Sequence, residues 1–226
     1  MNVALFGGTF DPIHLGHLAV ARAARERFKL AQVHFVPAHI PPHKQSQPIT
    51  AFSHRYAMVA LGTAGDAGFL TSLLESPEQA PDGANYTVDT VARFRRKLGK
   101  RDRLFFLIGI DAFLDIAHWR EPERLLSEVE FVVVSRPGFS LADVEAALPP
   151  SLRPAEQVKQ GVRRQPAAGE IVLANTTIHL LKGVAEKVSA TQIRNAAARG
   201  RSLDKLVGVL VADYIKKQGL YRDGAG

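Results

Sequence analysis

The sequence predicts an α/β fold built on a doubly wound parallel sheet. Short apolar runs alternate along most of the chain with longer stretches of helical periodicity, the pattern of strands joined by crossover helices. The apolar run at residues 104–109 is almost continuous, as expected for a strand that is buried on both faces. With 226 residues, of which 46% are hydrophobic, the chain can bury a sizeable core, so disorder is not expected as its main state.

The first part of the chain contains the elements on which this prediction depends. Residues 2–6 form an apolar run that stops at a pair of glycines, which indicates a first strand. A helix is expected over 14–29, because apolar side chains recur on one face while Arg22, Arg25 and Lys29 lie on the other. Further strands are expected at 33–36, 69–74, 104–109, 131–135 and 177–181, and further helices at 52–65 and 85–98.

Two helices are expected at the C-terminal end, within residues 186–222. Ser189 with Gln192 three residues later is a capping-box pattern, which predicts that a helix starts at Ser189. A second helix is expected from about Leu203 to Gln218, closed by Gly219.

One segment interrupts the alternation of strands and helices. Residues 149–175 carry four prolines and a small basic cluster without clear periodicity, so we expect a long surface excursion, mobile or partly helical. The chain has no internal repeat, and a single domain spanning 1–226 is expected.

Composition narrows the class of protein. The chain has no cysteine, which excludes a disulfide scaffold, a catalytic thiol and a cysteine-ligated metal. Its longest apolar stretch, residues 104–110, is far shorter than a membrane span, and its N-terminus lacks the basic leader of a signal peptide. We therefore expect a cytoplasmic protein with no membrane partner.

The net charge of +7 is concentrated in one segment. Residues 93–103 contain seven lysines and arginines and one aspartate, which gives +6 and leaves +1 of the total for all other residues. Such a run can bind nucleic acid or a polyphosphate. It can also be a solvated helix end, where cations lie near the negative end of the helix dipole. We expect the second, and no nucleic-acid partner.

Chemistry is expected where the first strand ends, because ligands of open α/β sheets bind at the carboxyl ends of the strands. Gly7 and Gly8 carry no Cβ and would let a bulky anion approach the backbone. The helix that follows offers free N–H groups and the positive end of its dipole. His14 and His17 are three residues apart, so both rings can lie on one face and donate hydrogen bonds to a phosphate. Together these features predict phosphate binding.

Other interpretations of this segment are weaker. His14 and His17 could be a metal pair, but two ligands do not complete a site and no carboxylate is suitably spaced, so no protein metal site is predicted. The G-x-G-x-x-G dinucleotide pattern is absent, and Gly99-Lys100 is followed by Arg101, where a P-loop needs Ser or Thr.

The same segment carries a family signature. Residues 8–17 read Gly-Thr-Phe-Asp-Pro-Ile-His-Leu-Gly-His, which matches the G-x-F-D-P-x-H-x-G-H pattern of the nucleotidyltransferase superfamily. Further motifs follow in order: Pro-Pro-His-Lys at 41–44, Tyr-Thr-Val-Asp-Thr at 86–90, Ile-Gly-Ile-Asp at 108–111, Trp119, Arg-Pro-Gly at 136–138, Ser-Ala-Thr-Gln-Ile-Arg at 189–194 and Gly-Leu-Tyr-Arg at 219–222. From Asn2 to Arg222 the chain resembles bacterial nicotinate-nucleotide adenylyltransferases.

The resemblance implies a Rossmann-like nucleotidyltransferase fold with C-terminal helices. It also implies a reaction of NAD biosynthesis, in which ATP and nicotinate mononucleotide give nicotinate adenine dinucleotide and pyrophosphate. His14 and His17 would be the catalytic residues, and Mg²⁺ the cofactor, held mainly by the ATP phosphates. Because the attacking phosphate is already anionic near neutral pH, positioning and charge neutralisation should suffice without a general base.

The resemblance also assigns substrate contacts. ATP would contact Gly7, Gly8, Thr9, Phe10, His14, His17, Gly109, Asp111, Ser189 and Arg194. Nicotinate mononucleotide would contact Lys44, Thr87, Trp119 and Arg136. Taken from the residues alone, helix capping is open for Asp111 and Thr87, packing for Trp119, and a surface ion pair for Arg136. Arg120 departs from the family pattern, which often has an aromatic residue at that position.

Other functions fit parts of the sequence. An adenylyltransferase for nicotinamide mononucleotide, or for another phosphate acceptor, would use the same chemistry. A basic nucleic-acid-binding protein would use residues 93–103 but leaves the histidine motif unexplained. A nucleotide sensor without turnover fits poorly, because every phosphate-contacting motif residue is present. Small-molecule substrates are therefore expected, and a homo-oligomer is left open.

Overall fold

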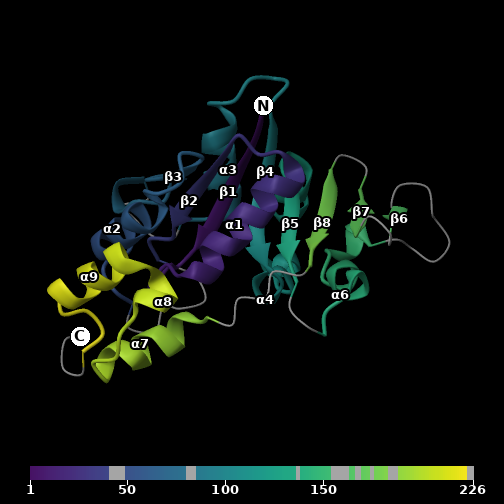
Figure 1. Ribbon diagram of the computed structural model, residues 1–226. Coiled ribbons are helices and arrows are strands. Elements are labelled where there is room, and N and C mark those ends of the chain that lie inside the picture. The colour runs from purple at the N-terminus through teal and green to yellow at the C-terminus, as the bar shows by residue number, and fades with distance from the viewer. Residues whose placement is uncertain are drawn as a thin grey trace. The chain divides into compact units, whose positions relative to one another are not determined.

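The computed structural model describes residues 1–40, 49–79, 85–135, 138–153, 163–165, 169–173, 176–182 and 188–222. The chain divides into two compact units. Unit 1 comprises Met1–Phe6, Ala24–Ala31 and Tyr86–Val184, and unit 2 comprises Gly7–Ala23, Gln32–Asn85 and Ala185–Gly226. Strands and helices alternate along the chain, as the α/β prediction requires (Figure 1).

Four parallel strands form the centre of unit 1. Their order across the sheet is β1 (Asn2–Gly8), β4 (Arg103–Gly109), β5 (Glu130–Val134) and β8 (Thr177–Leu181). Strand β4 pairs with a neighbour on both sides, and its residues 104–108 are all buried. The continuous apolar run is therefore a central strand of the sheet, as the sequence predicts.

The excursion expected at 149–175 contains regular structure. A 3-10 turn, η4 (Pro150–Leu152), is followed by β6 (Arg163–Gln165) and β7 (Glu170–Val172). Strand β6 pairs with β7, and β7 with β8, both antiparallel, so this hairpin extends one edge of the parallel sheet (Figure 1). The sequence predicts a surface excursion here, mobile or partly helical, and does not reveal its two strands, because strands of three residues are too short to show a readable alternation.

The helices of unit 1 separate its strands along the chain. The first complete one is α3 (Thr87–Arg95), which lies within the helix expected over 85–98 and buries Val88, Val91 and Phe94. It is followed by α4 (Ile110–Phe113), η3 (Ile116–His118), α5 (Pro122–Glu128) and α6 (Leu141–Ala146). The longest of these four has seven residues, so periodicity alone does not predict them.

Unit 2 contains a parallel strand pair and two groups of helices. The long helix α1 (Leu15–Phe28) begins in it. Strands β2 (Gln32–Pro37) and β3 (Phe69–Thr71) are parallel and are connected through α2 (Phe52–Thr63); η2 (Pro77–Gln79) follows. The C-terminal helices are α7 (Ala190–Ala198), α8 (Asp204–Val207) and α9 (Val209–Lys217), and α9 packs against α2. No helix in the described parts of the chain has the length and apolar character needed to cross a bilayer.

The single helix expected over 203–218 is in fact two helices. Gly208, with φ 84° and ψ 156°, ends α8 and precedes α9, and almost only glycine adopts this conformation. The apolar periodicity continues across the break, which is why the sequence pattern does not reveal it. The end of α9 is as predicted: Gly219 has φ 64°, and the N–H of Leu220 donates to the carbonyl of Ile215 over 3.0 Å, as in a Schellman motif.

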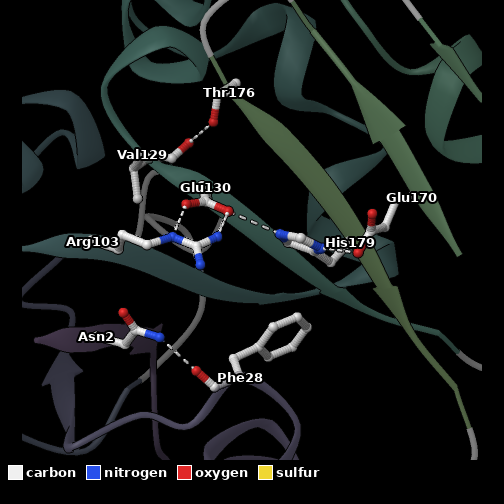
Figure 2. A network of polar contacts seen from close by, with 8 residues as sticks. All are labelled: Asn2, Phe28, Arg103, Val129, Glu130, Glu170, Thr176 and His179. Carbon is white, nitrogen blue, oxygen red and sulfur yellow. Dashed lines mark hydrogen bonds and ion pairs between the residues drawn. The ribbon is translucent and has the colours of Figure 1, made fainter. Parts of the chain in front are cut away.

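A polar network ties four strands of unit 1 together (Figure 2). Arg103 on β4 donates two hydrogen bonds, of 2.8 and 2.7 Å, to the carboxylate of Glu130 on β5. His179 on β8 has both ring nitrogens 3.0 Å from carboxylate oxygens, one of Glu130 and one of Glu170 on β7. Burial alone would raise the pKa of Glu130, but the hydrogen bonds from His179 and Arg103 outweigh burial and lower it to about 2.

Candidate functional site

The signature segment, residues 7–17, follows the buried part of β1 and lies in unit 2. Phe10 has a positive φ of 50° and turns its ring back over Gly8. A Cβ on Gly8 would lie only 3.0 Å from that ring, so a larger residue there would require the ring to shift by a few tenths of an ångström. The Phe10 ring is 2% exposed and contacts Phe35 of β2, with centroids 5.8 Å apart. Phe10 therefore supports the segment from the core.

His14 and His17 stack on each other at the start of α1. Their ring centroids are 3.7 Å apart and their planes are inclined by 24°. The Phe10 and His17 rings meet in a T-shaped contact, at a centroid distance of 5.0 Å. The backbone N–H of His14 donates to Nδ1 of His17 over 3.2 Å. The two rings lie side by side, as their spacing predicts.

Burial keeps both imidazoles neutral near pH 7. It lowers the pKa of His14 to about 4. Burial, with a further contribution from His14, lowers the pKa of His17 well below its ordinary value. Because Nδ1 of His17 already accepts a hydrogen bond, its ring proton lies on Nε2, which can donate. Nδ1 of His14 is buried and has no hydrogen-bond partner within the described residues, so a ligand or water is needed to supply one.

Asp11 is the point at which distant segments of unit 2 meet. Its backbone carbonyl accepts a hydrogen bond of 2.8 Å from Nη1 of Arg194. Its carboxylate, in a residue 7% exposed, accepts from the hydroxyl of Tyr221 at 2.6 Å and from the N–H of Thr50 at 3.3 Å. Arg194 and Tyr221 belong to motifs that lie 183 and 210 residues further along the chain. The structure therefore joins three of the sequence motifs at one residue.

The second motif opens α7 in the predicted way. Oγ of Ser189 accepts from the N–H of Gln192 at 3.3 Å, and the side chain of Gln192 accepts from the N–H of Ser189 at 3.1 Å. This is the capping box that the sequence predicts, and the helix start at Ser189 is confirmed. Arg194 also donates to Oγ1 of Thr191 over 3.3 Å.

Arg55 on α2 is a residue of this region that sequence reasoning missed. Its side chain is 1% exposed. The guanidinium donates to the backbone carbonyls of Thr50 at 2.7 Å, Thr9 at 2.8 Å, Ala38 at 2.6 Å and His39 at 3.0 Å. Burial lowers the pKa of Arg55 and the charge of Asp11 raises it. Arg55 thus holds the signature segment, the end of β2 and the start of α2 in one arrangement. The available signal was an arginine inside a helix otherwise rich in apolar residues.

Other predicted contact residues lie in unit 1. Gly109 ends β4 and is exposed, with nothing within 4 Å of the position that a Cβ would take. Asp111, in the first turn of α4, is also exposed. The N-cap of α4 is Gly109, and the N-cap of α3 is Tyr86. Asp111 and Thr87 lie inside the helices that follow these caps. The alternatives in which Asp111 and Thr87 cap these helices are therefore wrong.

Trp119 follows η3 and is half-buried. Its Nε1 is buried, and no described residue provides a hydrogen-bond partner for it. The guanidinium carbon of Arg120 lies 4.6 Å from the ring centroid of Tyr86, the N-cap residue of α3. The segment after η3 therefore lies next to the start of α3, which contains Thr87. Lys44 and Arg136 lie outside the described residues.

The groups around the signature segment suit an anion. Within the described ranges, no three His, Asp or Glu side chains gather closely enough to hold a metal ion. The donors present are neutral imidazoles and a guanidinium, and the carboxylate of Asp11 is already hydrogen-bonded. A divalent cation that arrives with a polyphosphate would take its oxygen ligands from that polyphosphate and from water.

A family model described as cytidylyltransferase-like matches residues 5–196, and fold and motifs together define the chain as a nucleotidyltransferase. A Moorella thermoacetica protein named a probable nicotinate-nucleotide adenylyltransferase is 39% identical, over 98% of this chain and 92% of its own length. A Pelobacter propionicus protein of the same name is 37% identical, over 99% of each. The chain belongs to the nicotinate-nucleotide adenylyltransferase family.

Solved structures confirm the predicted fold class. A Plasmodium falciparum nicotinic acid mononucleotide adenylyltransferase complexed with NaAD has a TM-score of 0.69 at 19% identity, and the match covers 97% of each chain. The same enzyme complexed with APC has a TM-score of 0.68. At this identity the likeness concerns the fold alone, a Rossmann-like doubly wound α/β fold with C-terminal helices.

Proposed function

We propose that the protein transfers the adenylyl group of ATP to nicotinate mononucleotide, giving nicotinate adenine dinucleotide and pyrophosphate in NAD biosynthesis. The observation that carries the proposal is the stacked pair of His14 and His17, two neutral imidazoles at a helix start. His14 is buried, and no described residue provides a hydrogen-bond partner for its Nδ1. A polyanion supplies the hydrogen-bond partner that this pair needs. Similar proteins named for this reaction support the choice of substrates.

In the proposed reaction, a phosphate oxygen of the mononucleotide attacks the α-phosphorus of ATP in line. A new P–O bond forms while the bond to the departing pyrophosphate breaks. The attacking oxygen carries its negative charge beforehand, so the protein positions the reactants and stabilises developing charge. Nε2 of His17 donates to the phosphoryl oxygens, and its orientation is set before substrate binds by the hydrogen bond at Nδ1.

We assign the triphosphate to the signature segment and the second motif. The backbone of residues 7–9 would approach the phosphates. His14 and His17 would donate from the start of α1, and Ser189 from the N-cap of α7. Arg194 uses Nη1 and Nη2 in bonds to protein atoms and retains further N–H donors for the β- and γ-phosphates. The exposed carboxylate of Asp111 suits ribose hydroxyls, and the open space at Gly109 suits the adenine ring.

Mg²⁺ is part of the proposal as a cofactor of ATP. The donor set described above fits an ion that is held mainly by phosphate oxygens and water, because the nearby side chains are imidazoles and a guanidinium. When bound there, the ion would neutralise phosphate charge. The residues of the chain bind and orient the phosphates themselves.

The acceptor is assigned to the remaining motif residues. Trp119 would stack on the pyridine ring, and its Nε1, which has no partner among the described residues, would donate to a polar group of the ligand. Thr87, at the start of α3, would help to bind the nicotinate carboxylate, and Lys44 and Arg136 would contact phosphate. The proposed partners are ATP and nicotinate mononucleotide, with no nucleic acid or membrane. The proposed location is the cytoplasm, because the reaction consumes ATP. The oligomeric state stays open, and a homo-oligomer fits the proposal.

The test is a substrate comparison. Purified protein is incubated with ATP and Mg²⁺, once with nicotinate mononucleotide and once with nicotinamide mononucleotide, and the products are separated by chromatography. We expect a strong preference for the nicotinate substrate. Equal or reversed preference would support adenylyl transfer but contradict the proposed role of Thr87 and Trp119 in selecting nicotinate. No dinucleotide from either substrate would overturn the proposal.

A gel-shift titration distinguishes the nucleic-acid alternative. Part of the basic segment 93–103 is engaged within the protein, since Arg103 is paired with Glu130 and Arg95 donates to the carbonyl of Asp102. We expect no tight binding of DNA or RNA at physiological salt. Tight binding that weakens steeply with added salt would favour the alternative.

A further inference from the structure

The last motif, at residues 219–222, has no part in the function proposed above, yet its tyrosine reaches the signature segment. The hydroxyl of Tyr221 donates a hydrogen bond of 2.6 Å to Oδ1 of Asp11. Asp11 directly follows Phe10, whose ring packs against His17, and lies three residues before His14. We propose that Tyr221 is a positioning residue for the transfer reaction: by holding Asp11, it sets the His14–His17 pair in the geometry that turnover needs. This inference rests on the proposed function.

The end of the chain is built to deliver this side chain to Asp11. The Schellman motif at Gly219 reverses the chain after α9, with N–H bonds from Gly219 to Lys216 at 3.3 Å and from Leu220 to Ile215 at 3.0 Å. Tyr221 itself has φ 61°, an uncommon conformation for a residue other than glycine. Such a conformation persists where surrounding contacts overdetermine it. The hydrogen bond to Asp11 is such a contact.

On the other side of the bond, Asp11 is held from three directions. Thr50 donates to the second carboxylate oxygen and Arg194 to the backbone carbonyl. Among these contacts, the hydroxyl of Tyr221 is the one that a single-atom change removes without altering charge or backbone. Burial, and next the charge of Asp11, raise the pKa of Tyr221 above its ordinary value, so the hydroxyl stays protonated and can donate throughout an assay range around neutral pH.

Unit 2 offers a matched control for a role in stability alone. The hydroxyl of Tyr214, on α9, is joined to Nδ1 of His54 on α2 by a hydrogen bond of 2.9 Å. Tyr214 and Tyr221 are both partly buried and only seven positions apart in the sequence. Tyr214 therefore ties α9 to α2, whereas Tyr221 ties the chain end to the signature segment. Loss of either hydroxyl should cost similar stability.

The experiment compares the variants Tyr221→Phe and Tyr214→Phe. We expect Tyr221→Phe to lower kcat about tenfold, because small misplacements of reacting groups cost one to two orders of magnitude, roughly, in rate. The KM values for ATP and nicotinate mononucleotide should stay within about twofold, and Tyr214→Phe should leave kcat unchanged. Melting temperatures should fall by similar amounts in both variants. An unchanged kcat in Tyr221→Phe, or an equal loss in Tyr214→Phe, would overturn the proposal.

A second measurement does not depend on activity. In ¹H–¹⁵N spectra of the histidine rings, Tyr221→Phe should shift the signals of His14 and His17, and Tyr214→Phe that of His54. Unmoved His14 and His17 signals in Tyr221→Phe would contradict the positioning role. If wild-type protein makes no dinucleotide, the proposed function fails, and these spectra still decide whether Tyr221 sets the histidine pair.

A double-mutant cycle tests the route through Asp11. If Tyr221 acts by holding that carboxylate, the loss in kcat from Asp11→Asn combined with Tyr221→Phe should be smaller than the product of the two separate losses. Independent, multiplicative losses would show that the hydroxyl does not act through Asp11.

Discussion

His17 is oriented by the protein before any substrate binds. Phe10 packs against one side of its ring, His14 stacks on it, and the backbone N–H of His14 determines which ring nitrogen carries the proton. A donor whose direction and tautomer are set in advance can stabilise developing charge without reorganising. At the scale of single residues, Nε2 of His17 is therefore a donor whose direction is set before the proposed substrate binds.

Replacement of His17 by alanine removes this donor. We expect His17→Ala to lower turnover by roughly two or more orders of magnitude, the scale seen when one preorganised donor is lost. Circular dichroism should show the wild-type helix and strand content. The control is His118→Ala, because the side chain of His118 is 84% exposed and lies outside the motifs. A fully active His17→Ala protein would contradict the assigned role.

Among the secondary-structure elements, the break between α8 and α9 depends on one glycine. A residue with a Cβ at position 208 would have to adopt the backbone angles φ 84° and ψ 156°, which costs about 1–3 kcal/mol. We expect Gly208→Ala to lower the free energy of unfolding by that amount in urea titrations. Gly65→Ala is the matched control: Gly65 has nothing within 4 Å of its Cβ position and no positive φ, so the change should be neutral or stabilising by about 0.4–1 kcal/mol. Equal effects would show that the backbone at Gly208 is not strained.

The strands of unit 1 are joined by a network whose strength should depend on pH (Figure 2). The pKa of Glu130 is lowered from 4.5 to about 2 in the folded protein, so its ionised form stabilises the fold above pH 4.5. That contribution is lost as the pH falls from 4.5 to 2, and its size is on the order of 3 kcal/mol. We expect Glu130→Gln to be less stable than wild type at pH 7, with a difference that shrinks below pH 4.5.

Urea unfolding at pH 7, 5, 4 and 3 measures this difference. The matched control is Glu128→Gln, because Glu128 forms a surface pair with Arg124 at 2.8 Å one helical turn away. Such pairs contribute about 0.3–0.5 kcal/mol, so that variant should differ little from wild type. A Glu130→Gln deficit that is the same at pH 3 and pH 7 would show that the network does not act through this carboxylate.

Across the whole molecule, local patterns were predictable and long-range contacts were not. The central strand and the capping box at Ser189 depend on neighbours in sequence, and both are confirmed. The hydrogen bond from Tyr221 to Asp11 joins residues 210 positions apart, and no pattern in a single sequence predicts such a contact. Arg55 was missed for the same reason, since its partners are backbone carbonyls of separate loops. The strands β6 and β7 were too short for their alternation to be read.

If the proposed function holds, ATP should stabilise the whole folded chain, because a ligand that binds only the folded state shifts the unfolding equilibrium toward it. At about 100 times the dissociation constant the gain is about 2.7 kcal/mol, which corresponds to a rise in melting temperature of roughly 5–10 °C for a chain of this size. If the β- and γ-phosphates are bound through the signature segment and the second motif, ATP with Mg²⁺ should raise the melting temperature more than AMP at equal concentration. The His17→Ala and Arg194→Ala proteins should lose most of that difference, since each lacks a phosphate donor. Calorimetric scans of the wild-type, His17→Ala and Arg194→Ala proteins with each nucleotide measure this difference in melting temperature. Equal shifts by ATP and AMP in wild type would show that the β- and γ-phosphates contribute little to binding.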